Sequence, residues 1–173
     1  MSNSHILIIV PLLLILGAAT LLDWREHKIP NVLTFGAALF GLILQGSLNG
    51  PAGLGLAAAG WIVCLVCFLP FYVKGGMAAG DVKLMAAVGA FIGPAAGIFA
   101  CLFTLIAGGL IGLASIACVW SARQLASSSS EAGIDLRAAL RTRIPYAGAI
   151  AAGTSFVLLV PGVIPASLTQ LGG

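Results

Sequence analysis

The chain has 173 residues, a mean hydropathy of +1.13 and only 8% charged residues, with eight Lys and Arg against five Asp and Glu. Because an ordinary soluble domain carries about 25% charged residues, this composition excludes a soluble globular protein and predicts an integral membrane protein. The net charge of +3 is small and confined to predicted loops beside lipid headgroups, so no nucleic-acid partner is expected.

All charged residues fall in three islands, at positions 23–28, 74–83 and 123–143. The charge-free stretches between them, 29–73 and 84–122, are each about twice the roughly 20 apolar residues that one crossing needs. Two crossings for each of these stretches and one for each terminal stretch make six. All three islands then lie on one side, which the positive-inside tendency identifies as cytoplasmic. The predicted fold class is therefore an all-α membrane protein, one domain over residues 1–173, with six transmembrane helices and periplasmic termini.

The first crossing is predicted over residues 6–22, as a retained helix rather than a cleaved signal, because its positive charges follow it. The second is predicted over 30–48, with Pro30 at its first position, and the third over 54–73 after an Asn49-Gly50-Pro51 turn.

The stretch 84–122 divides either at Gly93-Pro94, which makes crossing four short, or nearer Gly97. The sequence leaves both open. Small residues in crossings five and six, such as Gly109, Gly112 and Gly153, predict close helix packing. The last crossing is predicted over 144–163.

The third island contains serines at 127–130 and then amphipathic spacing over 135–141, which predicts a short helix on the cytoplasmic interface. The four cysteines lie in apolar crossings. Cys64 and Cys67 have CxxC spacing, but no second pair or nearby His completes a zinc site, so no metal is expected.

Two carboxylates, Asp23 and Asp81, come from separate islands to one membrane face. Asp81 could instead cap the N-terminus of crossing four. Asp23 lies at a helix C-terminus, where the helix dipole disfavours an anion, so its main alternative role is a surface ion pair with Arg25 or Lys28. Lys83, two positions after Asp81, is expected to extend to the lipid headgroups rather than to pair with Asp81.

Two carboxylates held close in a partly dry site share one proton, so that one acts as a base and the other as an acid. The base could activate a water to attack a peptide carbonyl, and the acid could protonate the leaving amine. Neither a metal nor a cofactor is needed. A serine mechanism is disfavoured because Ser155 lies mid-crossing away from both histidines, and no HExxH sequence exists.

Two segments resemble the signature segments of the type IV prepilin leader peptidases. One is Asp23-Trp-Arg-Glu-His-Lys-Ile29-Pro30-Asn31, and the other is Gly75-Gly-Met-Ala-Ala-Gly80-Asp81-Val-Lys83. The Ile144-Pro145-Tyr146 opening of crossing six is also similar to that family. The resemblance implies catalysis by Asp23 and Asp81, supported by motif residues Lys28, Ile29, Pro30, Asn31, Gly75, Gly76, Ala78, Ala79, Gly80 and Lys83.

The resemblance further implies a bacterial inner-membrane aspartic peptidase without cofactor or metal. Its partners would be prepilin and pseudopilin precursors, whose basic leader it would cleave at the cytoplasmic boundary of the bilayer. The family pattern is G-x-G-D, whereas Ala78 stands at the first Gly here, so local geometry is expected to differ. The chain lacks the cysteine-rich segment of the members that also methylate the new N-terminus. It therefore resembles the small form associated with Flp or tight-adherence pili, and N-methylation is not expected.

Two other functions are compatible with the residues alone. Two acids among abundant intramembrane glycines could belong to a small ion-coupled transporter, although transporter sites usually lie near the bilayer midplane. A non-catalytic assembly factor of a secretion system would use the islands only to dock partners. The oligomeric state and the particular pilin are not encoded in any recognisable pattern.

Overall fold

The computed structural model of the chain describes residues 3–26, 29–126 and 146–159. These residues form four helices, α1 (Asn3–Glu26), α2 (Asn31–Val73), α3 (Ala79–Ala126) and α5 (Tyr146–Leu159), and they contain no strand. The prediction of an all-α protein is confirmed. The serines at 127–130 and the predicted helix at 135–141 lie outside the described residues.

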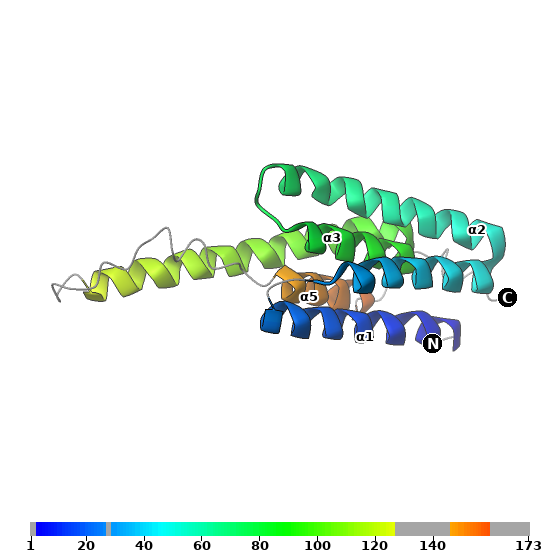
Figure 1. Cartoon of the computed structure of the whole chain (residues 1–173), viewed down its shortest axis with the longest axis horizontal. Helices are drawn as coiled ribbons and strands as arrows, with labels where there is room; N and C mark the ends of the chain where they lie inside the picture. The colour runs from blue at the N-terminus through cyan, green and yellow to red at the C-terminus, as the bar shows by residue number, and fades with distance from the viewer. Residues whose placement is uncertain (1–2, 27–28, 127–145, 160–173) are drawn as a thin grey trace.

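The two longest helices each double back at a glycine. The backbone of α2 has φ 63° at Gly50, directly before Pro51, and that of α3 has φ 75° at Gly93, directly before Pro94. Glycine adopts positive φ without steric cost, and proline has no N–H with which to continue a helix. Figure 1 shows the second arm of each helix running back along the bundle. The predicted Asn49-Gly50-Pro51 turn is confirmed.

The turn within α3 lies at Gly93-Pro94, and the alternative near Gly97 is wrong. The first arm of α3, residues 79–92, is consequently short, about 21 Å at 1.5 Å per residue. It is shorter than the roughly 30 Å hydrocarbon core of a bilayer. Of the two divisions that the sequence allowed, the structure has the one with a short first arm.

Three of the described helices are long and apolar enough to cross a membrane, over Ile6–Glu26, Asn31–Val73 and Ala79–Cys118, and α5 is a shorter apolar helix. The helix boundaries differ slightly from the predicted ones. α1 continues beyond residue 22 to Glu26, so that Asp23 lies within its last turn. Pro30 is the N-cap of α2 rather than its first helical residue, and its carbonyl accepts the N–H groups of Leu33 and Thr34.

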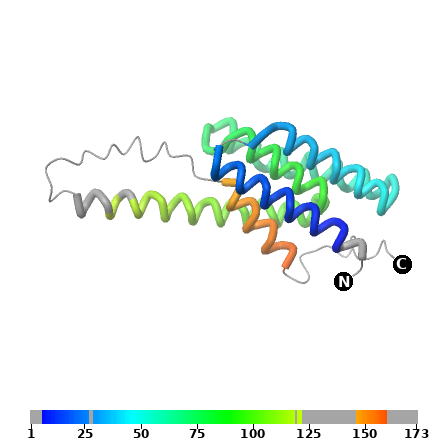
Figure 2. The backbone as a smooth tube through the Cα atoms, turned by 60° about the horizontal axis from the view of Figure 1, so that its bottom comes forward, coloured from blue at the N-terminus to red at the C-terminus, as the bar shows by residue number. Residues whose placement is uncertain are grey.

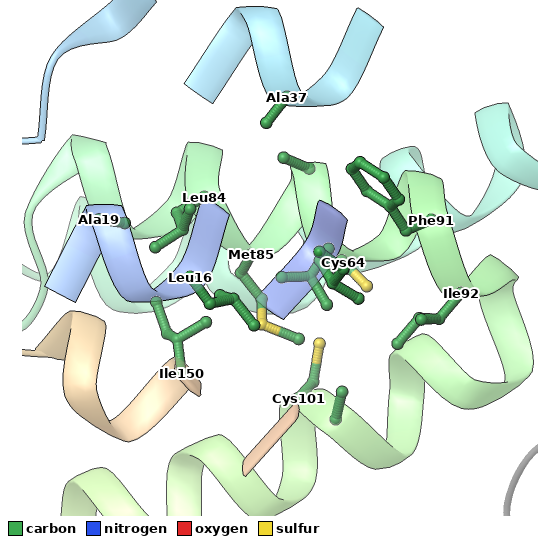
Figure 3. Packing of buried hydrophobic residues seen from close by; sticks show 14 of the residues in the cluster. Leu16, Ala19, Ala37, Cys64, Leu84, Met85, Phe91, Ile92, Cys101 and Ile150 are labelled. Carbon is green, nitrogen blue, oxygen red and sulfur yellow. The ribbon is translucent and has the colours of Figure 1, made fainter. Parts of the chain in front are cut away.

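The first arm of α3 is the centre of the bundle. Every residue from 84 to 93 is buried, which is expected of a helix that is apolar on all sides and surrounded by others. Figure 3 shows Leu84, Met85 and Phe91 among side chains of the neighbouring helices, including Leu16 of α1 and Ile150 of α5. The first turn of this arm, which carries Asp81, therefore continues directly into the buried centre of the bundle.

Glycines allow the helices around this centre to approach closely. A Cβ at Gly89 would strike the Gly60 backbone and the Cys64 Sγ, so the first arm of α3 and the second arm of α2 touch backbone to backbone. A Cβ at Gly153 would likewise come within 2.6 Å of the Thr104 hydroxyl oxygen. The prediction of close packing is confirmed for Gly153 and wrong for Gly109, beside which nothing lies within 4 Å.

Beyond the bundle, α3 continues as an isolated helical arm (Figure 1). Gly108 packs against the Tyr146 ring at the start of α5, and the helix then extends to Ala126. Leu110, Leu113 and Trp120 on this arm are each more than 60% exposed. The arm therefore contributes nothing to the buried core.

Candidate active site

Three helix ends that carry the predicted site meet at one end of the bundle. The C-terminal end of α1, the start of α3 and the start of α5 lie together there in both views (Figures 1 and 2). The turns at Gly50 and Gly93 lie at the opposite end. The two segments that carry Asp23 and Asp81 are thus brought to the same end of the molecule.

Asp23 is held by the first turn of α5. Its Oδ2 accepts a hydrogen bond from the Ala147 backbone N–H, with 3.3 Å between nitrogen and oxygen. One turn earlier on α1, the Thr20 hydroxyl donates to the Leu16 carbonyl at 2.8 Å and reaches the Ala147 carbonyl at 3.5 Å. Since the first N–H groups of a helix have no partner within it, a carboxylate supplied by another helix satisfies one of them.

The sequence reasoning missed this role for Asp23. Asp23 is unfavourably placed for its own helix dipole, but it is favourably placed for that of α5. Within the described residues its carboxylate bonds to α5 and not to Arg25, so the surface pair with Arg25 is wrong. Lys28 lies outside the described residues.

Asp81 lies in the first turn of α3 and is 5% exposed. Its backbone N–H donates to the Ala78 carbonyl at 3.1 Å, and the N–H of Val82 donates to the same carbonyl at 3.4 Å. Ala78 therefore occupies the N-cap position, and the interpretation of Asp81 as the capping residue is wrong. The helix begins at Ala79 and turns the carboxylate-bearing residue inward, where it is buried at the edge of the core.

The two signature segments contact each other directly. Gly80, just before Asp81, packs against Ile29, because a Cβ at Gly80 would lie 3.1 Å from the Ile29 Cβ. Three residues further along α3, the Lys83 Nζ donates a hydrogen bond to the Asn31 Oδ1 at 2.9 Å. The same ammonium lies 5.2 Å from the centre of the Phe35 ring. The sequence reasoning did not anticipate Asn31 and Phe35 as neighbours of Lys83, and the extension of this side chain to the headgroups stays a prediction.

The glycines at 75 and 76 end α2. Gly75 has φ 74°, its N–H donates to the Tyr72 carbonyl, and the Gly76 N–H donates to the Phe71 carbonyl, both at 2.9 Å. This pattern is a Schellman motif, which satisfies the last carbonyls of a helix and favours Gly at the left-handed position. The chain therefore turns tightly between the end of α2 and the start of α3.

Ala78, which stands where the family pattern has its first Gly, is exposed. Its methyl group is therefore not packed against the core. Ala79 is also exposed, as the first residue of α3. Both residues form the start of this helix.

Away from this end, three thiols gather in the middle of the bundle. The Cys101 thiol lies close to those of Cys64 and Cys67, a contact between α3 and the second arm of α2 that the CxxC spacing alone did not reveal. Within the described residues, no group of His, Cys, Asp and Glu side chains could hold a metal ion. The thiols are part of the apolar packing.

Two partners at this end were not among the predicted site residues. The Ala147 N–H binds Asp23, and the Phe35 ring lies beneath Lys83. Every residue except proline has a backbone N–H, so the residue type does not predict that the Ala147 N–H binds Asp23. The only related feature in the sequence was the family-like segment Ile144-Pro145-Tyr146, which directly precedes Ala147.

The fold and this arrangement define an all-helical membrane protein in which Asp23, held by the start of α5, and Asp81, buried in the first turn of α3, lie at the same end of the bundle. A scan against family models matches residues 8–113 to the type IV leader peptidase family. The matched residues are more than half of the chain and include both signature segments, so the protein belongs to this family. No curated protein and no solved structure matches the chain.

Proposed function

We propose that this protein is an aspartic endopeptidase of the bacterial inner membrane that removes the leader of Flp-type prepilins and pseudopilins. Family membership supports a leader peptidase role in general. The finer proposal is that Asp23 and Asp81 together activate a water for attack on the scissile peptide bond. One carboxyl takes the proton from water, and the other protonates the departing amine.

The observation that carries the proposal is the direct packing of the two signature segments. Ile29 lies on Gly80, and Asn31 accepts a hydrogen bond from Lys83, so that segments some fifty positions apart share one end of the bundle. The burial of Asp81 supports an acid–base role, because a partly dry site drives the proton affinities of two neighbouring carboxyls apart. Asp23, half-buried and bonded to α5, is in a different environment.

The topology proposed with this function has six crossings, formed by α1, the two arms of α2, the two arms of α3, and α5. The reversals at Gly50 and Gly93 support it, because they return the chain to the end that carries the charged islands. That end would face the cytoplasm, with both termini in the periplasm. The same reversals weigh against a transporter, since the helix breaks are turns at the far end rather than midplane discontinuities beside the acids.

The test is processing of a co-expressed Flp-type precursor. Asp23→Asn and Asp81→Asn should each leave the protein inserted and abolish conversion of the precursor to its shorter form. Glu26→Gln is the matched control, because it neutralises an exposed acid one turn from Asp23 and should process normally. If both Asn variants process the precursor at the wild-type rate, the proposal is wrong.

A further inference from the structure

The first turn of α5, which holds Asp23, is itself held against α3. The Tyr146 ring lies on Gly108 in the second arm of α3. Directly after Tyr146, the Ala147 N–H donates to the Asp23 Oδ2 at 3.3 Å. Gly108 is buried and Tyr146 is half-buried. Two adjacent residues of one turn therefore contact α3 and the carboxylate on α1.

Position 108 leaves room for the Tyr146 ring because it has no side chain. A Cβ there would lie 2.7 Å from the Tyr146 Cε1 and 3.3 Å from its Cδ1, and real Cβ atoms essentially never approach other heavy atoms within 3.0 Å. The ring could avoid an added methyl group only by rotating off the α3 surface or by moving the first turn of α5 with it. Either movement removes the contact that locates Ala147.

A second contact fixes the place of α5 along α3. Two turns further along α5, a Cβ at Gly153 would come within 2.6 Å of the hydroxyl oxygen of Thr104, whose side chain is fully buried. On the side of α1, the Thr20 hydroxyl reaches the Ala147 carbonyl at 3.5 Å. The start of α5 is thus held by α1 and by α3 at once.

The helix that receives Tyr146 also carries the second acid. Asp81 lies in the first turn of α3, and Gly108 lies beyond the break at Gly93, on the second arm of the same helix. One helix therefore places Asp81 directly and reaches Asp23 through the start of α5. In catalysis a displacement of about 1 Å between reacting groups can cost roughly 100-fold in rate, so this connection matters for activity.

We propose that Gly108 and Tyr146 are positioning residues, which set the place of Asp23 relative to Asp81 through the Ala147 N–H. The inference rests on the proposed peptidase function and gives neither residue a chemical step. The ring on Gly108 fixes the first turn of α5, that turn presents the Ala147 N–H, and the N–H orients the Asp23 carboxylate.

The experiment compares Gly108→Ala with Gly109→Ala in the purified full-length protein, with a full-length precursor in detergent micelles as the substrate. Gly109 is the matched control, because it is the next residue of the same helix, is exposed and has nothing within 4 Å. Both changes raise the intrinsic helix propensity by the same amount, so a difference between them reports the ring contact. Rates are measured well below the midpoint of thermal unfolding of each variant.

Gly108→Ala should lower kcat by about tenfold or more with KM unchanged, because the carboxylate moves while the substrate-binding surface does not. Gly109→Ala should keep the wild-type kcat. Tyr146→Ala should also lose kcat, since it leaves the turn without its anchor, and Tyr146→Phe, which keeps the ring, should rescue that loss. In the double variant Gly108→Ala/Tyr146→Ala the methyl group meets no ring, so it should be no worse than Tyr146→Ala alone.

Equal kcat values for Gly108→Ala and Gly109→Ala would overturn the proposal. So would a raised KM with an unchanged kcat, which would indicate a contact with the substrate, and so would losses that multiply in the double variant, which would indicate two independent packing defects. If Gly108→Ala is not recovered folded, a wild-type kcat in Tyr146→Ala overturns the proposal by itself. A wild-type enzyme that leaves the precursor uncleaved would instead refute the proposed function, and the positioning inference with it.

Discussion

The two ends of the bundle are held together in opposite ways. At the end with the turns, Gln45 is 3% exposed and donates to the Phe91 carbonyl at 2.5 Å, while Asn49 donates to the Gln45 Oε1 at 2.7 Å. At the end with the signature segments, the bond from Lys83 to Asn31 is exposed, and that from Ala147 to Asp23 is only partly buried.

The two ends differ because the turn end contains backbone carbonyls that have lost their helical partners, whereas the signature end is open to water. Phe91 lies in the last turn before the break at Gly93, where carbonyls lose their helical partners, so a buried amide replaces them. At the other end the Lys83–Asn31 and Ala147–Asp23 bonds are within reach of water, as the proposed hydrolytic site requires. We therefore expect substitutions at the turn end to change stability, and those at the signature end to change activity.

The largest effect is expected at the two aspartates. Asp23→Asn or Asp81→Asn should lower kcat by at least about 100-fold, the usual contribution of a general acid or base. The midpoint of thermal unfolding in detergent should change little for Asp23→Asn, whose amide oxygen can still accept from Ala147. A folded variant that keeps its kcat would break the assignment of the signature end to chemistry.

One turn before the break at Gly93, Gly89→Ala tests the tightest helix contact. The added Cβ meets the Gly60 backbone, which cannot move aside as a side chain would. Overpacking of this kind should cost about 1–3 kcal/mol in the free energy of unfolding. Gly55→Ala, in open space, should be neutral or slightly stabilising. The midpoints of thermal unfolding of the two variants test this prediction, and equal midpoints would contradict it.

At the turn end, Gln45→Leu removes the buried partner of the Phe91 carbonyl. An unsatisfied buried acceptor costs about 1–3 kcal/mol, so the unfolding midpoint should fall. The kcat of the folded fraction should stay at the wild-type value. Ser47→Ala, an exposed change on the same helix turn, serves as the control. A loss of kcat in folded Gln45→Leu would show that the two ends are coupled.

The smallest expected effect on stability belongs to Lys83→Met. Its hydrogen bond to Asn31 is exposed, and such contacts contribute about 1 kcal/mol or less. Because the bond joins the two signature segments, kcat should nevertheless fall several-fold. Asn31→Ala should have the same effect, and the double variant should be no worse than either single one. Lys74→Met removes an exposed cation outside this contact and should leave kcat unchanged.

Much of the fold could be predicted because lipid leaves few options for a charge-free stretch. An apolar stretch of twice the crossing length must double back, and Gly50-Pro51 marked the first of the two places. For the second, the sequence left Gly93-Pro94 and a turn near Gly97 as alternatives, and the structure selects Gly93-Pro94. The contact between Gly60 and Gly89 could not be predicted. Many glycines in the chain look alike in sequence, and only the packing of two arms selects the pair that touches.

For the candidate site, the residues could be named but their partners could not. The motif identified Asp23, Asn31 and Lys83, yet it did not indicate what holds these side chains in place. For Asp23 the only non-catalytic role considered was a surface ion pair, and Lys83 was expected to extend to the headgroups. The actual partners, the Ala147 N–H and the Asn31 amide, lie 124 and 52 positions away. Local reasoning about helix dipoles considers only the helix on which a residue lies.

The sequence by itself determined that the chain is an apolar helical protein, that the first long apolar stretch reverses at Gly50-Pro51, and which two acidic residues belong to the signature segments. Those properties depend on composition, on the length of apolar stretches and on the backbone limits of glycine and proline. Only the tertiary structure decided that the first arm of α3 is the buried centre, that α5 holds Asp23, and that the Tyr146 ring lies on Gly108. Each of these depends on which surfaces meet when separate helices pack, and no single helix encodes that.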